Sequence, residues 1–432
     1  MNKQKVVYGD FREKFTIPEV WKISKIEDLV KKIKAGGTPD TKISKYYDGK
    51  IPFISISDMT KGKKYLNSEI KTITNEGLEN SAAWIVPKNS LLLSMYATIG
   101  KPLINKKEIS THQGILGIIP TEKIIELEFL YYALLYIRPK LVRYFLIGTQ
   151  ANLNLHISKN LKIIHPENIK EQEKIALILS NADYLISSYD EILTHTKCLK
   201  HGLMQTLLTK GIGHKKFKNV DLGFGKIIEF AEEWEIGKLN ENTSKIGSGI
   251  TPLGGSEIYQ KEGIPLIRSQ NVHFDGLHLD NVAHITQEIH DKMNGSKLQS
   301  DDVLLNITGA SIGRCSIVPK GFGEGNVNQH VCIIRSKPSL FPGFLNYFLT
   351  SSLMQNVINS VQGGLSRQGL NFKDLGNLYI PIPKFEEQQK IAAIISKIDN
   401  KIVDLKLKKT NLEILKKGLM QKLLTGERRV NV

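Results

Sequence analysis

Cysteine and long apolar runs are both scarce in this chain, and their scarcity excludes several classes of protein. Its 432 residues include three cysteines, Cys198, Cys315 and Cys332, which lie far apart and form no Cys-x-x-Cys pair. This usage argues against a disulfide framework or a zinc knuckle and is typical of a reducing compartment. No apolar run approaches the roughly 18 residues that a membrane span requires, and residues 1–5 lack the apolar core of a signal peptide. We therefore expect a cytoplasmic protein that does not cross a membrane.

Sequence signatures of nucleotide and methyl-donor sites are also lacking. The chain has no Gly-x-x-x-x-Gly-Lys-Ser/Thr loop, so no ATP site is indicated. It has no Asn/Asp-Pro-Pro-aromatic motif, which would hold a flipped adenine. The segment Asp221–Gly225 (Asp-Leu-Gly-Phe-Gly) resembles a turn that binds S-adenosylmethionine, but it follows a lysine-rich linker where such a site requires a strand. We expect this chain to have no cofactor and no catalytic residue.

Basic residues outnumber acidic ones. The chain has 59 Lys and Arg against 43 Asp and Glu, a net charge of +16, and a pI of about 9.4. This balance favours a polyanionic partner, usually nucleic acid, because phosphate contacts release condensed counterions. The alternative is a lysine-rich surface without such a partner. The hydrophobic fraction of 41% is sufficient for folded cores.

The second half of the chain repeats the first. Landmarks in the first 100 residues recur 213 residues later, and landmarks after residue 170 recur 216 residues later. The recurring pairs are Trp21 with Trp234, Gly36-Gly37-Thr38-Pro39 with Gly249-Ile250-Thr251-Pro252, Ile51–Ser55 with Ile264–Arg268, Ala97–Gly100 with Ala310–Gly313, Glu171–Ala176 with Glu387–Ala392, and Gly202–Gln205 with Gly418–Gln421. A period of half the chain indicates a duplicated unit, because solenoid repeats span only about 20–50 residues.

Each copy combines a mixed module with a long helix. Residues 15–165 and 228–383 consist of short β-rich runs broken by Gly, Pro and Asn, and one helix is expected in each, around Glu128–Arg143 and Phe344–Val361. Pro139 should end or kink the first of these helices.

The two long helices are expected over residues 171–209 and 387–425. Their apolar residues recur at intervals of three and four, close to a heptad seam, and a glycine follows each helix. A helix of about 57 Å with one apolar stripe needs a partner. We expect the two helices to pack antiparallel with the modules at opposite ends. The alternative is that each helix packs on its own module.

The expected fold class is therefore α/β: two similar α+β modules separated by two long antiparallel coiled-coil helices, with a pseudo-twofold internal repeat. The expected domains are residues 1–168 for the first module, 169–212 for the first long helix, 213–384 for the second module with its leading linker, and 385–432 for the second long helix.

Together and in this order, these motifs resemble the specificity (S) subunits of type I restriction-modification systems. The Gly-Gly-Thr-Pro loop, the Ile-Pro-Phe-Ile-Ser strand, Glu-Gln-x-x-Ile-Ala at the start of a long helix and Gly-Leu-Met-Gln-x-Leu-Leu-Thr at its end carry the resemblance. It extends from about Trp21 to Gly426. No single motif is specific, but their duplicated order is. The second loop departs from the first, because Ile250 stands where the first copy has Gly37, which leaves its turn open.

The resemblance implies two target-recognition domains, each reading one half of a bipartite double-stranded DNA site. It also implies a non-catalytic subunit on which two methyltransferase (M) subunits and often ATP-dependent restriction (R) subunits assemble. The alternative is a self-contained DNA adenine methyltransferase or nuclease with fused target-recognition domains. The missing adenine-pocket motif and the near-symmetric halves argue against that alternative. A repeat scaffold that binds no DNA is disfavoured by the charge.

Candidate DNA contacts follow the loop and strand motifs of each module, since hydroxyl, amide and Arg side chains can read base edges and Lys can engage phosphates. The alternative for each is an ordinary surface polar residue. In the first module the candidates are Thr38, Ser55, Ser57, Asp58, Lys61, Lys63, Lys64 and Gln113. In the second they are Thr251, Arg268, Gln270, Asn271, His273 and Gln329, with Tyr96, Gln150, Arg314 and Arg367 as weaker candidates from both modules.

Apolar residues near the ends of the long helices are candidates for contacts with M subunits. They are Met204, Leu208, Met420 and Leu424. The alternative, equally favoured, is that they complete the intramolecular seam.

One loose pattern of metal-dependent nucleases is present. Asp58 with Glu69 and Lys71 could hold Mg²⁺ and activate water. The second copy has Asn271 in place of Asp58, however, and a duplicated catalytic unit would be expected to keep the carboxylate. Solvated loop charge is the favoured interpretation.

Histidines are dense in the second module, at His273, His278, His284 and His290. A zinc site would require fixed spacing and usually Cys partners. Exposed polar loops, or a histidine that touches DNA, are therefore favoured, and we expect no metal site.

Overall fold

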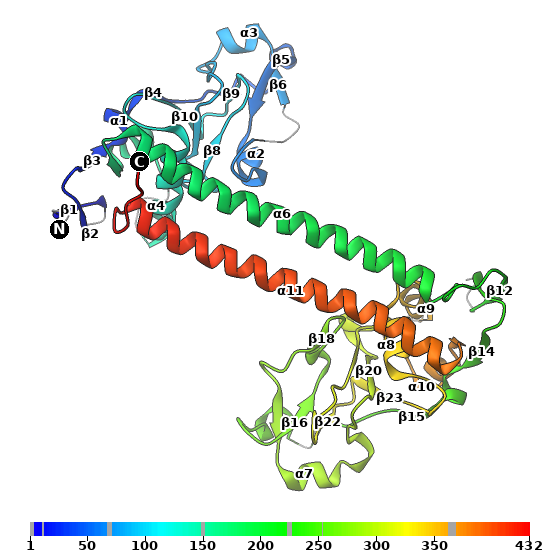
Figure 1. Ribbon diagram of the computed structural model, residues 1–432. Coiled ribbons are helices and arrows are strands. Elements are labelled where there is room, and N and C mark those ends of the chain that lie inside the picture. The colour runs from blue at the N-terminus through cyan, green and yellow to red at the C-terminus, as the bar shows by residue number, and fades with distance from the viewer. Residues whose placement is uncertain are drawn as a thin grey trace. The chain divides into compact units, whose positions relative to one another are not determined.

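The computed structural model describes residues 4–10, 13–66, 71–147, 152–222, 227–252, 254–361 and 369–432. The chain forms two compact units (Figure 1): unit 1 is Met1–Asp190 with Leu407–Val432, and unit 2 is Glu191–Lys406. Each unit contains one globular module and part of each of the two long helices, α6 (Ile169–Leu207) and α11 (Phe385–Leu424). The helices expected over residues 171–209 and 387–425 are therefore confirmed.

The module of unit 1 is built on two sheets. A four-stranded antiparallel sheet has the order β4 (Val30–Ala35), β10 (Ile115–Pro120), β7 (Leu91–Ser94) and β8 (Pro102–Ile104). The strand β7 is buried along its length, because its Leu run packs on both faces. A three-stranded sheet has the order β6 (Lys71–Ile73), β5 (Tyr47–Ile54) and β9 (Ser110–Thr111), and β5 pairs parallel with β9.

The module of unit 2 repeats this topology strand for strand. Its four-stranded sheet has the order β15 (Thr243–Ser248), β23 (Val331–Ser336), β20 (Val303–Asn306) and β21 (Cys315–Ile317). Its three-stranded sheet has the order β19 (Ala283–Ile285), β16 (Ile264–Ile267) and β22 (Asn326–Val327), with β16 parallel to β22. The duplication expected from the sequence is thus a duplication of fold.

Smaller paired strands are repeated as well. In unit 1 they are β1 (Gln4–Tyr8) with β2 (Lys14–Pro18), and β3 (Trp21–Lys25) with β11 (Lys162–Pro166). In unit 2 they are β12 (Phe217–Asp221) with β13 (Ile227–Ala231), β14 (Glu235–Lys238) with β24 (Tyr379–Ile382), and the extra hairpin β17 (Val272–His273) with β18 (Gly276–Leu277).

Helices complete each module. Unit 1 has α1 (Ile26–Leu29), η2 (Ser44–Tyr46), α2 (Ile56–Lys61), α3 (Asn75–Glu79), α4 (Leu127–Ile147) and α5 (Leu155–Asn160). Unit 2 has η3 (Leu239–Asn242), η4 (Gly255–Ile258), η5 (Ser269–Asn271), α7 (Gln287–Lys292), η6 (Asn294–Ser296), η7 (Gly309–Ser311), α8 (Pro342–Thr350), α9 (Ser352–Val361) and α10 (Phe372–Gly376).

Two details of the module helices refine the sequence expectation. Pro139 lies inside α4, which continues past it to Ile147, so the helix does not end there, and a kink at Pro139 stays a prediction. The single helix expected over 344–361 is instead two helices, because Ser351 is extended and its hydroxyl accepts the backbone N–H of Met354 at 3.2 Å, which caps the start of α9.

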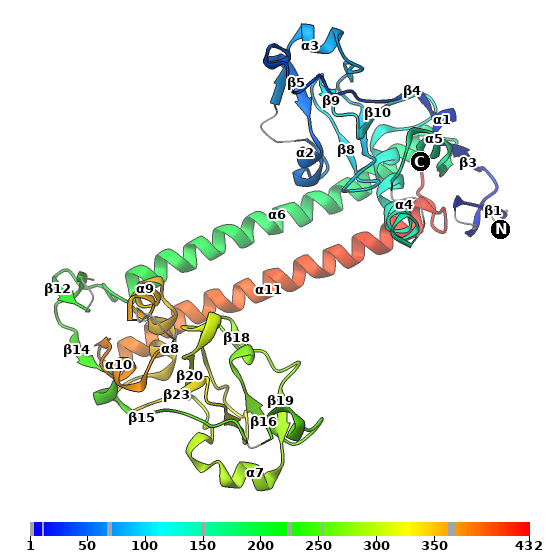
Figure 2. The ribbon, with the colours of Figure 1, turned by 180° about the vertical axis from the view of Figure 1, so that it is seen from behind.

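Within each unit, α6 and α11 lie side by side and antiparallel (Figures 1 and 2). In unit 1, Lys416 bonds to Asp183 at 2.5 Å and Lys409 to Asp190 at 2.7 Å, so residue numbers fall along α11 as they rise along α6. In unit 2, Lys200 and Asp399 form an ion pair of 2.6 Å. The antiparallel packing expected from the sequence is confirmed at these contacts.

The repeated Glu-Gln pair joins each module to its long helix. Gln172 is fully buried, accepts the N–H of Glu126 at 2.8 Å and donates to the carbonyls of Ile124 and Pro166. Its counterpart Gln388 accepts the N–H of Phe341 at 2.7 Å and donates to the carbonyls of Ser339 and Pro383. A buried amide satisfied at both ends fixes the helix start against the module.

The preceding glutamates hold the segments that follow the long helices. Glu171, 1% exposed, accepts two hydrogen bonds from Arg429, at 2.9 and 2.7 Å. Glu387 accepts the N–H of Ile212 at 2.9 Å, lies 3.0 Å from His214 and accepts the indole N–H of Trp234 at 3.2 Å. The Glu-Gln motif is therefore explained by folding alone.

A second repeated device connects a module tyrosine to both long helices. In unit 1, the Tyr132 hydroxyl donates to Asp183 at 2.6 Å, and Asp183 also pairs with Lys416. In unit 2, Tyr347 donates to Asp399 at 3.0 Å, and Asp399 pairs with Lys200. Burial and the neighbouring Asp carboxylate raise the pKa of both tyrosines, so each hydroxyl remains a donor.

Candidate nucleic-acid interface

The parallel strand pair in each module places the candidate loops at one sheet edge. In unit 1, Phe53 is aligned with Ser110 and Ile54 with Thr111. Because parallel strands end on the same side, the residues after Ile54 and those after Thr111 emerge together. In unit 2, Ile267 is aligned with Val327 in the same way.

Edge 1, as we define it, consists of Thr38, Ser55, Ser57 and Gln113. Ser57 and Gln113 are exposed, and Ser55 and Thr38 are half-buried. The backbone N–H of Gln113 donates to the Thr38 hydroxyl at 3.5 Å, and the hydroxyls of Ser55 and Ser57 share a hydrogen bond of 2.8 Å. The structure thus brings together four of the predicted candidates from three separate segments.

The glycine-rich loop can lie against edge 1 because Gly36 has no side chain. A Cβ on Gly36 would lie 2.1 Å from the carbonyl oxygen of Thr111, so the loop can approach β9 only with glycine there. Gly249 is equivalent, since its Cβ would lie 1.7 Å from the carbonyl oxygen of Val327. The next residue differs: Gly37 packs against Ala82 and Ala83, whereas Ile250 is 62% exposed, so the second loop has room for its side chain.

Edge 2 consists of the equivalent residues of unit 2: Thr251, Arg268, Gln270 and Gln329. Thr251, Gln270 and Gln329 are exposed, and Arg268 is half-buried. The guanidinium of Arg268 lies over the ring of Tyr259, 5.1 Å from its centre, and one of its NH₂ groups donates to the carbonyl of Asn281 at 3.4 Å. Among the described residues, no group accepts from the buried Nε of Arg268. Edge 2 therefore contains a half-buried guanidinium that contacts the Tyr259 ring and one backbone carbonyl.

Sequence reasoning did not find Tyr259. Its contact with Arg268 depends on the pairing of Gln260 with His284, which positions the segment before β16 beside the sheet. No local pattern around Tyr259 predicts that pairing. Tyr96, a weaker candidate, is exposed and lies against Gly114, next to Gln113 of edge 1. Arg314 is half-buried, and Gln150 and Arg367 lie outside the described residues.

Asp58 and Asn271 are buried and cap the turns that follow the two strands. A structural role therefore replaces the DNA contacts predicted for them. Asp58 is 8% exposed and accepts the backbone N–H of Ser55 at 2.9 Å and its hydroxyl at 2.6 Å. Asn271, 2% exposed, accepts the N–H of Arg268 at 3.0 Å and donates to the carbonyl of His278. Asp and Asn therefore perform the same capping role in the two copies, as expected for a turn following a strand.

The capping role explains the presence of Asp58, so no metal-dependent nuclease site is needed to explain it. Glu69, the second acid of the loose nuclease pattern, lies outside the described residues. The Asp221–Gly225 turn, which resembles a methyl-donor site, also lacks the strand–turn–helix arrangement that such a site requires. Gly223–Gly225 lie outside the described residues, but Asp221 ends β12, which is followed by the antiparallel strand β13 and not by a helix.

Three neighbouring lysines have different surroundings. Lys61 is exposed, and the Lys63 side chain is 78% exposed, with its Nζ 3.7 Å from Asp190. The Lys64 side chain is only 11% exposed and donates to Glu128 at 2.8 Å, Ser180 at 2.7 Å and Tyr132 at 3.2 Å. Lys64 is thus a structural cation and not a phosphate contact.

The Lys64 network is tightly satisfied. Glu128 also accepts the hydroxyl of Tyr65 at 2.5 Å and that of Ser180 at 2.7 Å. Burial raises the pKa of the Glu128 carboxyl, but the hydrogen bonds from Lys64, Ser180 and Tyr65 outweigh it and hold that pKa below its usual value. Burial and the bond to Glu128 raise the pKa of Tyr65. The network connects the loop after α2 to α4 and α6.

The four apolar candidates for M-subunit contact are buried, which corrects that prediction. Met420 and Leu424 belong to the core of unit 1, and Met204 and Leu208 to that of unit 2, with 1–9% of each residue exposed. The alternative holds: they complete intramolecular packing.

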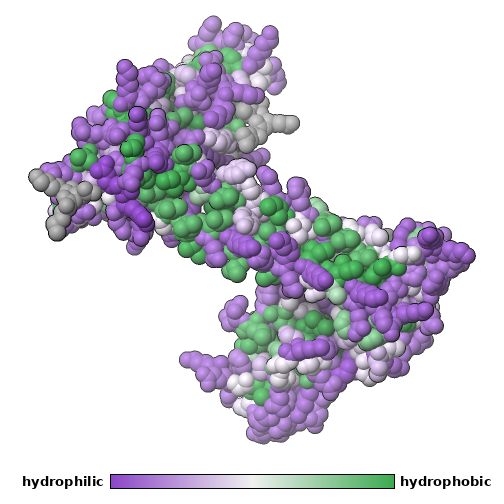
Figure 3. All heavy atoms as spheres, viewed as in Figure 1, coloured by the Kyte–Doolittle hydropathy of each residue, from purple (hydrophilic) through white to green (hydrophobic). Residues whose placement is uncertain are grey.

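Other apolar residues of the long helices are exposed instead, and Figure 3 shows hydrophobic surface over both helices. They are Leu177, Tyr184, Leu185, Ile192, Leu199, Ile394, Val403, Leu407, Ile414 and Leu415.

The histidines of unit 2 separate into different environments. The rings of His273 and His278 stack 4.0 Å apart beside Asp275. His290 is buried and shares a hydrogen bond of 2.5 Å with the side-chain oxygen of Asn326, and His284 lies in β19. The predicted DNA contact of His273 stays a prediction.

No helix among the described residues is long and apolar enough to span a membrane.

Comparisons with known proteins agree with this duplicated architecture. The model of the type I restriction modification DNA specificity domain matches residues 18–194 and again 231–416. The chain is 27% identical to the type I restriction enzyme MjaIX specificity subunit of Methanocaldococcus jannaschii, covering 96% of this chain and 95% of that protein. It is 26% identical to the EcoBI specificity subunit of Escherichia coli, covering 81% and 73%.

Solved structures share the fold. The type I restriction-modification S subunit from M. genitalium superimposes with a TM-score of 0.56 at 17% identity, covering 94% of this chain and 96% of that one. A chain from a structural study of assembly and conformational transition of a type I restriction-modification system superimposes with a TM-score of 0.59, also at 17% identity, covering 95% and 99%. With two copies of the family domain spanning most of its length, the chain belongs to the family of type I restriction-modification DNA specificity subunits.

Proposed function

We propose that this chain is the subunit that selects the DNA sequence for a type I restriction-modification complex. Edge 1 reads one half of a bipartite double-stranded DNA site and edge 2 reads the other. The observation that carries the proposal is that two topologically equivalent edges bear different polar side chains. Ser55 and Ser57 on edge 1 stand where edge 2 has Arg268 and Gln270. Equivalent positions with different chemistry fit two different half-sites, and therefore an asymmetric target.

The side chains of the two edges fit base recognition in the major groove. Arg can donate two hydrogen bonds to guanine, and Gln can donate to and accept from adenine. The stacking of Arg268 on Tyr259 holds its guanidinium in place before DNA arrives, which lowers the entropic cost of the contact. Lys61 and Lys63 are exposed and fit phosphates, which fix register without reading sequence.

We propose residues 1–168 and 213–384 as the two target-recognition domains, and residues 169–212 and 385–432 as the segments that carry the conserved helices. Two M subunits, and R subunits where the system has them, assemble on the chain in the cytoplasm. The exposed apolar side chains of α6 and α11, such as Tyr184 and Val403, replace the buried candidates as the expected contacts with M subunits. The chain itself is not catalytic.

Methylation-site mapping tests this function. The chain would be assembled with its M subunits, and methylated adenines would be sequenced for the parent and for Arg268→Ala and Ser57→Ala. Arg268→Ala should relax one base position in one half-site, at a cost of about 1–3 kcal/mol of discrimination if the contact is bidentate. Ser57→Ala should affect the other half-site only.

Two outcomes would contradict the proposal. One is that both substitutions relax the same half-site. The other is methylation by the purified chain alone, which would favour the self-contained methyltransferase.

A further inference from the structure

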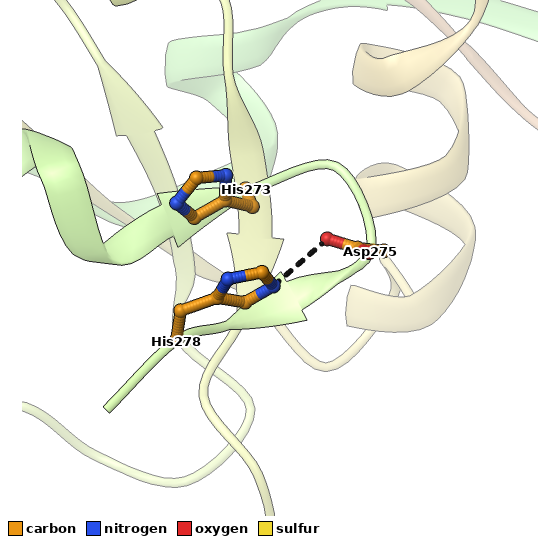
Figure 4. A group of neighbouring side chains, drawn as sticks. All are labelled: His273, Asp275 and His278. Atoms are coloured by element: carbon orange, nitrogen blue, oxygen red, sulfur yellow. Dashed lines mark hydrogen bonds and ion pairs between the residues drawn. The ribbon is translucent and has the colours of Figure 1, made fainter. Parts of the chain in front are cut away.

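The β17–β18 hairpin brings two histidines and an aspartate together. The hairpin pairs Val272 with Leu277 and His273 with Gly276, and beyond it Asn271 and His278 exchange hydrogen bonds of 2.9 Å. His273 and His278 are therefore diagonal neighbours on one face of the hairpin, a spacing at which large side chains touch. Their rings stack with an interplanar angle of 19° (Figure 4).

Asp275, in the turn of the hairpin, completes a set of three ligand atoms. Its Oδ1 lies 3.0 Å from Nε2 of His278, and one atom from each of the three residues lies within 4.8 Å of the others. Metal–ligand bonds of about 2.0–2.2 Å in a tetrahedral site place ligand atoms roughly 3.3 Å apart. Binding one ion would therefore also require the two stacked rings to rotate apart, because the lone pair of each imidazole lies in the plane of its own ring. The exposed position of Asp275 and His278 in the hairpin leaves room for that rotation.

A hydrogen bond to a backbone carbonyl orients the His273 ring. Nε2 of His273 lies 2.9 Å from the carbonyl oxygen of Gln270, which can only accept, so Nε2 carries the proton and donates it. In the neutral ring, Nδ1 of His273 is therefore the nitrogen that has the lone pair. Donation from the second ring nitrogen to a carbonyl is the arrangement that orients metal-binding histidines.

We propose that His273, Asp275 and His278 bind a divalent transition-metal ion of the zinc class. Two imidazoles and one carboxylate suit Zn²⁺, Co²⁺, Ni²⁺ or Cu²⁺ and not Mg²⁺, which prefers oxygen ligands. The cation replaces the proton that His278 shares with Asp275, and water fills the remaining position. Nζ of Lys406 lies 3.9 Å from the other oxygen, Oδ2 of Asp275, and its positive charge weakens the site without occupying Oδ1.

The site would stiffen the segment that follows Gln270 of edge 2. The hairpin begins two residues after Gln270, and the same Gln270 carbonyl orients His273. A bound ion would therefore join both ends of the hairpin directly beside a DNA-reading position. The metal site itself does not depend on DNA binding, so the two proposals can fail separately.

Zinc binding to the full chain, measured by equilibrium dialysis against chelator-buffered zinc without DNA, tests the site. The background should be Cys198→Ser, since Cys198 is an exposed thiol that can bind zinc itself. We expect one ion per chain, and roughly tenfold or greater weakening in each of His278→Asn, His273→Asn and Asp275→Asn. His156→Asn, which removes an exposed histidine from α5, is the matched control and should bind zinc like the background.

A second measurement separates coordination from nonspecific binding. Co²⁺ should give visible absorption typical of four or five ligands, and zinc should slow hydrogen exchange across residues 271–278. Circular dichroism checks that each variant folds, and two of the three variants suffice if one does not. Unchanged zinc affinity in the folded hairpin variants, or an equal loss in His156→Asn, would overturn the proposal.

Discussion

Ser55 and Arg268 occupy equivalent positions, one residue after the strand that carries each edge, but they offer different chemistry. The backbone around them is the same because Asp58 and Asn271 cap the same turn with the same acceptor geometry. The capping hydrogen bond is therefore the same in both copies, whereas the side chain at the capped position differs. The buried capping residue and an exposed polar residue can be adjacent in sequence, as Asp58 and Ser57 are in unit 1.

Lys63 and Lys64 provide a matched pair for testing this distinction. Lys63→Ala should weaken binding of the assembled complex to all DNA sequences and reduce its salt dependence, since a phosphate contact is lost. Lys64→Ala should instead lower the free energy of unfolding by about 1–3 kcal/mol, because Glu128 loses a partner in a part-buried network. Salt-dependent DNA binding and denaturant unfolding measure the two effects. The reverse assignment of effects would contradict the structure.

The sequence alone could not separate these two lysines. They are adjacent, both polar, and both follow the predicted strand, yet the partners of Lys64 lie 64 to 116 residues away. By contrast, the repeated loop was noticed from the sequence as a landmark of the duplication, and the structure shows that Gly36 and Gly249 each approach a backbone carbonyl too closely for a side chain. Local pattern predicted the edge loops; long-range contacts decided which side chains face outward.

His165 predicts a pH effect on stability. It lies in β11, where burial lowers its pKa below the usual value, and it bonds to the Ser24 hydroxyl at 3.0 Å and the Pro166 carbonyl at 3.1 Å. Between that lowered pKa and about 6.5, the unfolded chain binds more protons than the folded chain. Stability should therefore fall as the pH drops below about 6.5.

Urea unfolding of the parent and of His165→Asn at pH 7.5 and pH 5.5 measures this effect. The variant should lose less stability on acidification than the parent. Part of the loss should remain, since burial also lowers the pKa of His112. An identical pH dependence in the two proteins would show that His165 does not titrate as proposed.

At the scale of elements, the long helices were the easiest feature to predict and their contacts the hardest. An apolar stripe without proline over residues 171–209 was sufficient to predict a helix, and α6 begins and ends within two residues of that range. The stripe did not show which apolar residues are covered. Met204, near the end of α6, is buried in the core of unit 2, whereas Leu185 and Ile192, which belong to the same predicted apolar stripe, are 46% exposed.

In each unit, one Asp carboxylate connects a module tyrosine and a lysine, so removing that carboxylate should weaken the attachment of the module to the long helices. Asp183→Ala removes the acceptor shared by Tyr132 and Lys416 and should cost about 1–3 kcal/mol of local stability, discounted because the carboxylate is 28% exposed. Asp399→Ala should act in the same way on Tyr347 and Lys200.

Hydrogen exchange resolved by peptide measures where each substitution acts. Asp183→Ala should speed exchange in α4 and the adjoining part of α6, and Asp399→Ala in α8 and the adjoining part of α11. Asp280→Ala, at an exposed position of unit 2, is the control and should leave both patterns unchanged. Uniform acceleration by either variant would mean that the devices stabilise the whole chain and not one attachment.

At the scale of the whole molecule, the duplication predicts that the two reading functions are separable. Each unit has its own cores, its own four-stranded sheet and its own edge, and the hydrogen bonds described above for edge 1 join residues of unit 1 to one another. Replacing residues 15–165 with the matching module of a relative should therefore change one half of the recognised sequence only. The replaced segment must keep Glu126 and its loop, because Gln172 bonds to that backbone, and must keep the tyrosine that meets Asp183. Methylated-adenine sequencing of the chimera with its M subunits provides the measurement. Replacement of residues 228–383 is the reciprocal control and should change the other half. If either chimera alters both halves together, the two edges do not read independently, and the equivalence of their geometry would reflect shared ancestry without a division of recognition.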